Sequence, residues 1–174
     1  MTLLKELQSV TLAEFEAMEK QEGWNYELID GVVMMSPRPN PRHSELASRL
    51  AVKLMQYFQD ESCFVFFERE LHHNDAVLIP DLSFFCKDNT EVPLLVIEIL
   101  SPSTRSRDLI QKPYYYQKMG ILEYWIIDPE EETLMVFNLA EESAITTYQK
   151  GQIVQSIVKP EIQISLDELF KRFL

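Results

Sequence analysis

Short runs of apolar residues, bounded by turn-forming residues, recur along the chain and predict strands. Two of these runs flank Asp30-Gly31, a dipeptide that favours a tight β-hairpin. The run over residues 94–100 is almost entirely apolar, which is typical of a central strand buried on both faces. The predicted strands cover residues 26–29, 32–35, 63–71, 76–86, 94–100, 123–128, 133–139, 144–149 and 153–158.

Other segments follow the helical period. Apolar residues recur at every fourth position from Leu46 to Leu54, and Asn40 precedes this segment as a candidate N-cap. Thr11 with Glu14 three residues later is a capping-box signature. The predicted helices cover residues 11–20, 41–58, 105–119 and 165–173. We therefore expect a single α/β (α+β) domain over residues 1–174, with helices packed against one mixed sheet.

The composition is typical of a soluble globular protein. The chain has 174 residues, of which 46% are hydrophobic and 25% charged, and no apolar run approaches the roughly 18 residues of a membrane span. The first residues lack the basic flank and apolar core of a secretory signal. Cys63 and Cys86 both lie in apolar, strand-like segments, and we interpret them as core thiols of a reducing compartment. These observations predict a cytoplasmic protein without a membrane partner.

The net charge of -12 argues against avid, non-specific binding to nucleic acid, which depends on Lys and Arg neutralising phosphates. The positive charges are nevertheless concentrated in two segments, residues 36–60 and residues 101–120. If the two segments meet, they form a positive rim on an acidic body; otherwise they are two solvated helix faces. Their basic residues are Arg38, Arg42, Arg49, Lys53, Arg105, Arg107, Lys112 and Lys118.

Two carboxylates stand out against this background. Asp81 and Glu98 each follow an apolar strand-like run, and burying an unpaired carboxylate costs several kcal/mol or shifts its pKa. A shared Mg²⁺ or Mn²⁺ ion would compensate both charges, with the main-chain carbonyl of Ile99 as a further ligand. Glu27 would hold a metal-bound water, and a nearby lysine would stabilise developing charge. Alternatively, Asp81 turns a strand, Glu98 pairs with an arginine and Glu27 faces solvent.

Several further residues are candidates for binding a substrate. His43 lies in the first turn of a predicted helix, where main-chain N–H groups favour phosphate, or it is hydrogen-bonded locally. Arg42, Arg105 and Arg107 are candidates for phosphate contacts. We assign the tyrosines of residues 114–116 and Trp125 to the core rather than to base stacking, and His72 and His73 to an exposed turn.

A set of short motifs occurs in a defined order over about residues 11–138. They are Tyr26-Glu27-Leu28-Ile29-Asp30-Gly31, Met35-Ser36-Pro37, His43, Pro80-Asp81, Val96 to Thr104, Asp108, Lys112, Tyr116 and Gly120 to Pro129. In these motifs and in their order the chain resembles the Uma-two family, which belongs to the restriction-endonuclease-like superfamily.

The resemblance implies a restriction-endonuclease-like core, a mixed central sheet flanked by helices with additional hairpins. It also implies that Asp81 and Glu98 are the acidic residues of the superfamily motif and that Glu27 is the upstream acidic residue. The chain departs from the motif at Leu100, where the superfamily has lysine. Lys112 is the candidate replacement, but Pro113 requires the helix either to kink or to begin near Lys112.

These observations predict a Mg²⁺- or Mn²⁺-dependent DNA endonuclease with Glu27, Asp81, Glu98 and Lys112 as its catalytic residues. Two alternatives stay open at this point. Leu100 and the negative charge agree with an inactive nuclease fold that binds a protein or nucleic acid, and the acidic surface agrees with a hydrolase of small phosphate esters. We also expect a homodimer, because duplex cleavage in this superfamily usually needs two sites.

Overall fold

The structure is a computed structural model that describes residues 9–58, 63–86, 91–141 and 144–171. Its helices are α1 (Leu12–Ala17), α2 (Pro41–Gln56), the π-helix η1 (Arg107–Gln111), α3 (Lys112–Lys118) and α4 (Leu166–Phe170). Its strands are β1 (Trp24–Ile29), β2 (Val32–Pro37), β3 (Cys63–Phe67), β4 (Leu71–His73), β5 (Ala76–Leu78), β6 (Leu82–Cys86), β7 (Leu95–Ile99), β8 (Glu123–Asp128), β9 (Thr133–Asn138), β10 (Ala144–Tyr148), β11 (Ile153–Gln155) and β12 (Gln163–Ser165).

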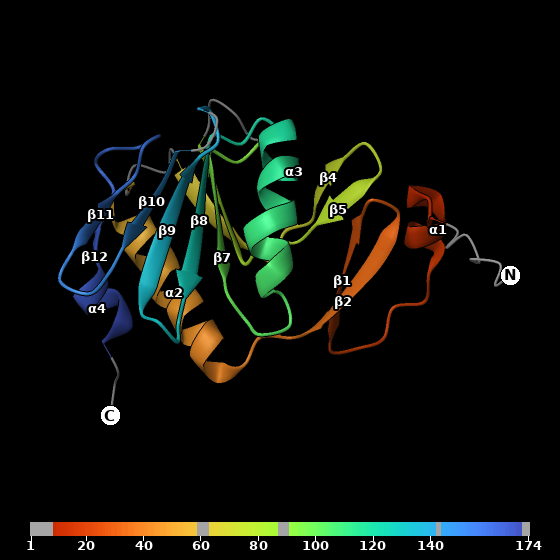
Figure 1. The fold of residues 1–174 in the computed structure, drawn as a ribbon, viewed down its shortest axis with the longest axis horizontal. Helices are drawn as coiled ribbons and strands as arrows, with labels where there is room; N and C mark the ends of the chain where they lie inside the picture. Colours follow the sequence, from red (N-terminus) through yellow and green to blue (C-terminus); the bar gives the residue numbers. More distant parts are fainter. Residues whose placement is uncertain (1–8, 59–62, 87–90, 142–143, 172–174) are drawn as a thin grey trace, which may run out of the picture.

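A mixed six-stranded sheet in the order β10-β9-β8-β7-β6-β3 forms the centre of the molecule (Figure 1). The central pair β7 and β8 is parallel, and every other neighbouring pair is antiparallel. β7 is buried along its whole length, as its continuous apolar run predicts. Helix α2 covers one face of the sheet and α3 the other.

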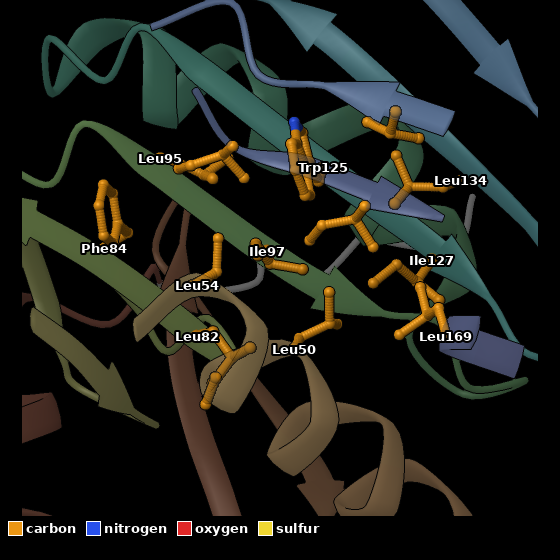
Figure 2. Close-up of a cluster of buried hydrophobic side chains, with 14 of the residues drawn as sticks. Leu50, Leu54, Leu82, Phe84, Leu95, Ile97, Trp125, Ile127, Leu134 and Leu169 are labelled. Carbon is orange, nitrogen blue, oxygen red and sulfur yellow. The ribbon is translucent and has the colours of Figure 1, made fainter. Parts of the chain in front are cut away.

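The alternation of side chains along the strands divides the core between the two faces. On the α2 side, Leu50 and Leu54 pack against Ile97, Trp125 and other buried residues of the sheet (Figure 2). On the α3 side, Tyr116 packs with the neighbouring residues of the same strands, among them Val96. Because successive side chains of a strand point to opposite faces, a residue's parity fixes which face of the sheet it reaches.

A second, four-stranded sheet in the order β2-β1-β5-β4 lies beside the first (Figure 1). The predicted hairpin at Asp30-Gly31 is confirmed, with φ of 51° and 70° at its two turn residues. A side chain at Gly31 would have its Cβ 2.4 Å from Cβ of Ser9, so this close approach excludes larger residues.

The predicted strands 63–71 and 76–86 are wrong as continuous elements. The first is divided into β3 and β4 and the second into β5 and β6, and the pieces belong to different sheets. Glu68 adopts a positive φ of 47°, and Pro80 lacks the N–H of a continuing ladder, so the chain changes direction at both places. The chain thus leaves the six-stranded sheet after β3 and returns to it at Asp81, between the two sheets.

The helices agree with the sequence in kind and differ in their ends. The capping box at Thr11 and the N-cap at Asn40 are both confirmed, while α1 ends at Ala17 rather than near residue 20. Helix α4 ends at Phe170, and the expected end at residue 173 lies outside the described residues. The short strand β12, which pairs with β11, was not predicted.

The interpretation of Cys63 and Cys86 as separate thiols is wrong, because the two residues form a disulfide. They face each other directly in the β3–β6 register, with their Cα atoms 3.9 Å apart. The sequence does not show which strands are neighbours, and so it does not show this pairing. Since disulfides are rare in reducing compartments, the expectation of a cytoplasmic protein loses one of its supports. Among the described helices, none has the length and apolar character needed to cross a membrane.

Candidate active site

Asp81 and Ile99 meet where β6 begins and β7 ends. The Asp81 oxygen Oδ2 accepts a hydrogen bond from the main-chain N–H of Ile99 at 2.6 Å. The same oxygen lies 3.0 Å from Nε2 of His43, which the first turn of α2 presents. The hairpin β4–β5 and the turn at Pro80 deliver Asp81 to this position, so the site depends on the crossing between the two sheets.

Glu98 occupies the neighbouring position on β7, and its side chain is on the α3 face. Its oxygen Oε1 accepts hydrogen bonds from Nζ of Lys112 and from the hydroxyl of Tyr116, both at 2.7 Å. Glu98 and Lys112 are buried, with 4% and 2% of their surfaces exposed. Leu100 points to the same face two residues later and packs in the core beside Tyr116.

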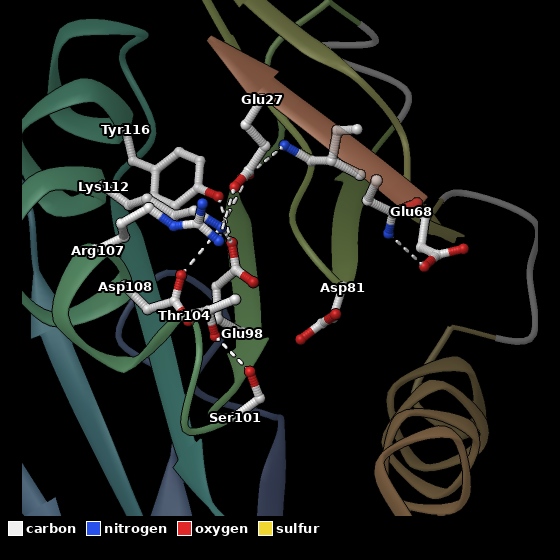
Figure 3. Close-up of polar contacts among 12 residues, drawn as sticks. Glu27, Glu68, Asp81, Glu98, Ser101, Thr104, Arg107, Asp108, Lys112 and Tyr116 are labelled. Atoms are coloured by element: carbon white, nitrogen blue, oxygen red, sulfur yellow. Dashed lines mark hydrogen bonds and ion pairs between the residues drawn. The ribbon is translucent and has the colours of Figure 1, made fainter. Parts of the chain in front are cut away.

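Lys112 is surrounded by three carboxylates (Figure 3). Besides Glu98, its Nζ lies 2.9 Å from Oε1 of Glu27 and 3.0 Å from Oδ1 of Asp108. Glu27 comes from β1 in the four-stranded sheet and also accepts a hydrogen bond from the main-chain N–H of Ile79 at 2.9 Å. The lysine therefore joins the two sheets and the α3 helix through one buried network.

The helix that carries Lys112 solves the problem that Pro113 creates. The five residues before Lys112 form a π-helical turn, in which the N–H of Lys112 donates to the carbonyl of Arg107. Pro113 then occupies the beginning of α3, where its missing N–H breaks no α-helical hydrogen bond. A π-helical turn of this kind is frequent at functional sites. Of the two sequence alternatives, the structure shows the helix that begins near Lys112.

The network shifts the pKa values of its members. Burial alone would lower the pKa of Lys112, but the charges of Glu98, Glu27 and Asp108 outweigh it and raise that pKa well above its usual value. Burial raises the pKa of Glu98, against the opposing effect of Lys112. Burial would lower the pKa of His43, yet its hydrogen bond to Asp81 and the Asp81 charge raise it.

A cavity of about 230 Å³ opens over this network. Glu27, Asp81, Glu98 and Lys112 all line it, together with His43 and the main chain around Ile99. Its rim is formed by the connector after β2 and by the loop after β7. The structure therefore brings all four predicted catalytic residues to one cavity.

The donor set of this cavity fits a hard divalent cation. Within the described residues, neither Oδ1 of Asp81 nor Oε2 of Glu98 receives a hydrogen bond, although the other oxygen of each carboxylate does. Both residues line the same cavity (Figure 3). In the described part of the chain no three His, Cys, Asp or Glu side chains are placed to share a metal. An ion here would thus combine two carboxylates with the carbonyl of Ile99 and water, as Mg²⁺ commonly does.

The arginines that the sequence favoured for phosphate contacts lie near the site but have partners. Arg42 donates to Glu45 at 3.0 Å, and Arg105 donates to Asp128 at 2.6 Å. Arg107 is almost completely buried, and its guanidinium is 3.8 Å from Glu27.

Two members of the network were not assigned a role in the chemistry from the sequence. Asp108 contacts Lys112, and Tyr116 donates a hydrogen bond to Glu98. Each of the two is one helical turn from Lys112. The spacing Asp108, Lys112, Tyr116 at every fourth residue is the signal that identifies one helix face. Tyr116 and Trp125 are fully buried, as expected, but the assignment of Tyr114 to the core is wrong, because 57% of its surface is exposed.

The comparison with family models explains this constellation. A model described as "Uma2: Putative restriction endonuclease" matches residues 12–167. The chain belongs to the Uma2 family. Family and fold together indicate a restriction-endonuclease-like nuclease, as the ordered motifs of the sequence suggested.

A solved structure shows the same fold as this Uma2 protein. The crystal structure of "a putative nuclease belonging to DUF820" from Anabaena variabilis superposes with a TM-score of 0.80 at 23% sequence identity. The similarity covers 92% of this chain and 97% of that one. The search of curated proteins found no match.

Proposed function

We propose that this Uma2 protein is a Mg²⁺- or Mn²⁺-dependent DNA endonuclease that hydrolyses a phosphodiester in the cavity over Asp81 and Glu98. The observation that carries the proposal is the 2.7 Å contact between Lys112 and Glu98. Through this contact Lys112 on α3 provides an ammonium group beside the acidic pair Asp81 and Glu98. The superfamily motif has its lysine at the position of Leu100, which carries no charge. The inactive alternative rested on Leu100, and Lys112 supplies from α3 the ammonium group that Leu100 lacks.

The chain's own residues have distinct roles in this proposal. Asp81 and Glu98, with the Ile99 carbonyl, are the ligands for the ion, and His43 fixes the orientation of Asp81 through the 3.0 Å contact. When bound, the ion supplies positive charge that polarises the scissile phosphate and lowers the pKa of water. Glu27 lines the same cavity and is oriented by the N–H of Ile79, so it is placed to hold a water. Attack of that water on phosphorus forms one P–O bond and breaks another, the attacking water loses a proton to solvent, and the departing oxygen takes up a proton from solvent.

Lys112 has a double role. An ammonium group has three donors, and the three surrounding carboxylates are enough to occupy all of them. In this arrangement Lys112 balances the buried negative charge and fixes Glu98 and Glu27. For Lys112 to donate to a water or to the phosphate, one carboxylate must release it. We propose that Glu98, which would also be a ligand for the ion, is the carboxylate that releases Lys112.

The test is cleavage of supercoiled plasmid and of single-stranded DNA with Mg²⁺ or Mn²⁺. Cleavage should require the ion and fall by at least about 100-fold in Asp81→Asn and in Glu98→Gln, because each removes a charge at the reacting centre. Asp75→Asn, a change in the exposed β4–β5 turn, is the matched control and should cleave normally. Equal cleavage by wild type and Asp81→Asn would refute the proposal. Hydrolysis of small nucleotide esters without cleavage of DNA would favour a small-ester hydrolase instead.

A further inference from the structure

A second cavity, of about 280 Å³, adjoins the candidate active site on the α2 side of the sheet. Arg38, Pro39, His43 and Asp81 line both this cavity and the one over Glu98. The pair His43 and Asp81 therefore forms the boundary between two connected depressions. A substrate whose scissile phosphate lies at Asp81 extends naturally into this second cavity.

One wall of the second cavity is an exposed aromatic ring. Phe67, the last residue of β3, has 52% of its surface exposed and faces small residues of α2 across the cavity, Ser44, Ala47 and Ser48. Successive side chains of β3 point to opposite faces of the sheet. Phe66 packs edge-on against Phe85 on the α3 face, so the Phe67 ring lies on the α2 face. An exposed ring at the wall of a cavity is a stacking surface for a planar group.

Arg38 stands where the two cavities meet, and it differs from the other cations around the site. In the part of the chain that the structure describes, no acidic group lies within ion-pair distance of Arg38. Arg42, Arg105, Arg107 and Lys112 all have such partners. Arg38 is thus the cation that is available for a phosphate on the substrate.

Glu68 brings a negative charge to the second cavity. It lines this cavity, and its carboxylate accepts a hydrogen bond at 3.0 Å from Asn25, which lines the first cavity. A phosphate beside Glu68 would be repelled, whereas a carboxylate accepts hydrogen bonds from the exocyclic amino groups of bases. A phosphate is therefore favoured at Arg38, and a base that stacks on Phe67 has Glu68 as a hydrogen-bond acceptor in the same cavity.

The scarcity of available cations also limits the class of nucleic acid. Proteins that bind duplex DNA neutralise several phosphates with Lys and Arg, and this chain has a net charge of -12. One arginine and one stacking ring match a flexible strand with an unpaired base far better than they match a duplex. The volume of about 280 Å³ lies just below the roughly 300–1,000 Å³ of small-molecule sites, which suits one nucleoside.

We propose that the cavity between Phe67 and α2 is a subsite for one unpaired nucleotide of single-stranded DNA, with Phe67 stacking on the base and Arg38 binding the adjacent phosphate. The subsite rests on the proposed nuclease function and defines its substrate as DNA that is single-stranded next to the scissile phosphate.

The test measures binding separately from cleavage. The probe is a fluorescein-labelled single-stranded oligodeoxynucleotide of about twelve nucleotides that contains only dA and dC, within the roughly 4–16 nucleotides of single-strand sites, and its matched duplex is the comparison. Fluorescence anisotropy is measured with Ca²⁺ in place of Mg²⁺, and a gel shows that the probe stays intact. Wild type should bind the single strand more tightly than the duplex.

Phe67→Ala should weaken single-strand binding by roughly 5- to 100-fold, while Phe67→Trp should restore it. Arg38→Ala should lower the slope of log K against log salt by about 0.7, and Arg38→Lys should keep the slope. The matched controls are Tyr114→Ala, an exposed aromatic on α3, and Lys150→Ala, an exposed lysine in the turn between β10 and β11; both should bind as wild type does.

The outcomes separate the subsite from the nuclease. Loss of binding in Phe67→Ala by a protein that cleaves nothing would keep the subsite and refute the nuclease. Cleavage that depends on Asp81 but binding that is unaffected by Phe67→Ala, or a preference for the duplex, would keep the nuclease and overturn the subsite. Absence of any binding to the single strand would also overturn the subsite.

Discussion

The ammonium nitrogen of Lys112 lies 2.7 Å from the carboxylate oxygen of Glu98, although 14 residues separate the two in the chain. This contact joins the central strand β7 to helix α3, which packs on it. With Glu27 and Asp108 the pair forms a buried group of three carboxylates and one lysine, to which Arg107 adds a second positive charge. The network is therefore both part of the candidate site and part of the structure that holds the two sheets together.

Lys112→Met should destabilise the protein by about 3–5 kcal/mol, because it leaves buried carboxylates without their counter-charge. Urea unfolding followed by circular dichroism measures this. Lys118→Met changes an exposed lysine of the same helix and should alter the free energy of unfolding by no more than about 0.5 kcal/mol. If both variants unfold at the same urea concentration as wild type, Lys112 does not stabilise the network.

The elements and the acidic residues of this network were predictable from the sequence, and their connections were not. The continuous apolar run around β7 predicts a central strand with Glu98 near its end, and Asn40 correctly marks the start of α2. The π-helical turn before Pro113 depends on tertiary packing and has no local pattern of its own. Likewise, the transfer of β4 and β5 to a second sheet depends on backbone angles at Glu68 and Pro80, which apolar periodicity does not record.

The Asp128 carboxylate makes the free energy of unfolding depend on pH in the acidic range. Burial would raise its pKa, but the N–H groups of Glu131 and Glu130 and the guanidinium of Arg105 lower it below the usual value. Because the folded-state pKa is the lower one, the stabilisation is complete above the unfolded-state pKa of about 3.9 and is lost as the pH falls through the folded-state pKa.

Wild type should therefore be more stable than Asp128→Asn near neutral pH, and the difference should shrink as the pH falls below about 4. Urea midpoints at a series of pH values test this. Glu161→Gln, at a solvent-exposed position, is the control for removing one negative charge. A difference between wild type and Asp128→Asn that stays constant down to the acid limit would contradict the assignment.

The disulfide between Cys63 and Cys86 joins an edge strand to its neighbour over a separation of 23 residues. A loop of this size restricts the unfolded chain by about 3 kcal/mol in the loop-entropy model. Reduction should therefore lower the urea midpoint of wild type. The urea midpoint of the double variant Cys63→Ala/Cys86→Ala should be the same with and without reductant.

Alkylation of the denatured protein followed by mass spectrometry provides an independent check of the same bond. Without reductant the two cysteines should remain unmodified, and with reductant both should react. Complete alkylation without reductant, in protein purified under air, would show that the two thiols stay separate.

Glu123 anchors the segment after β11 to the centre of the sheet. Its buried carboxylate accepts hydrogen bonds from the Trp125 indole at 2.6 Å, the Ser156 hydroxyl at 2.7 Å and the main-chain N–H groups of Ile157 and Val158. Glu123→Leu leaves these buried donors without an acceptor and should destabilise the protein by about 3 kcal/mol or more. Urea unfolding measures the loss, and Glu161→Leu is the control at a solvent-exposed position. An unchanged midpoint in Glu123→Leu would show that water replaces the carboxylate.

Metal binding at Asp81 and Glu98 has a readout that needs no substrate. An ion that binds only the folded protein stabilises it by RT ln(1 + [L]/Kd), which is about 2.7 kcal/mol when the ion is present at 100 times its Kd. Thermal unfolding of wild type should therefore shift upward with rising Mn²⁺ or Mg²⁺. Asp81→Asn removes one of the two carboxylates and should abolish most of the shift, while Asp75→Asn should retain it.

Because Glu98 is buried beside the excess negative charge of Glu27 and Asp108, the ion should also compete with Lys112 for that carboxylate. Lys112→Met should then bind Mn²⁺ more tightly than wild type, and weaker binding in that variant would mean that the lysine instead holds Glu98 in the geometry that the ion requires.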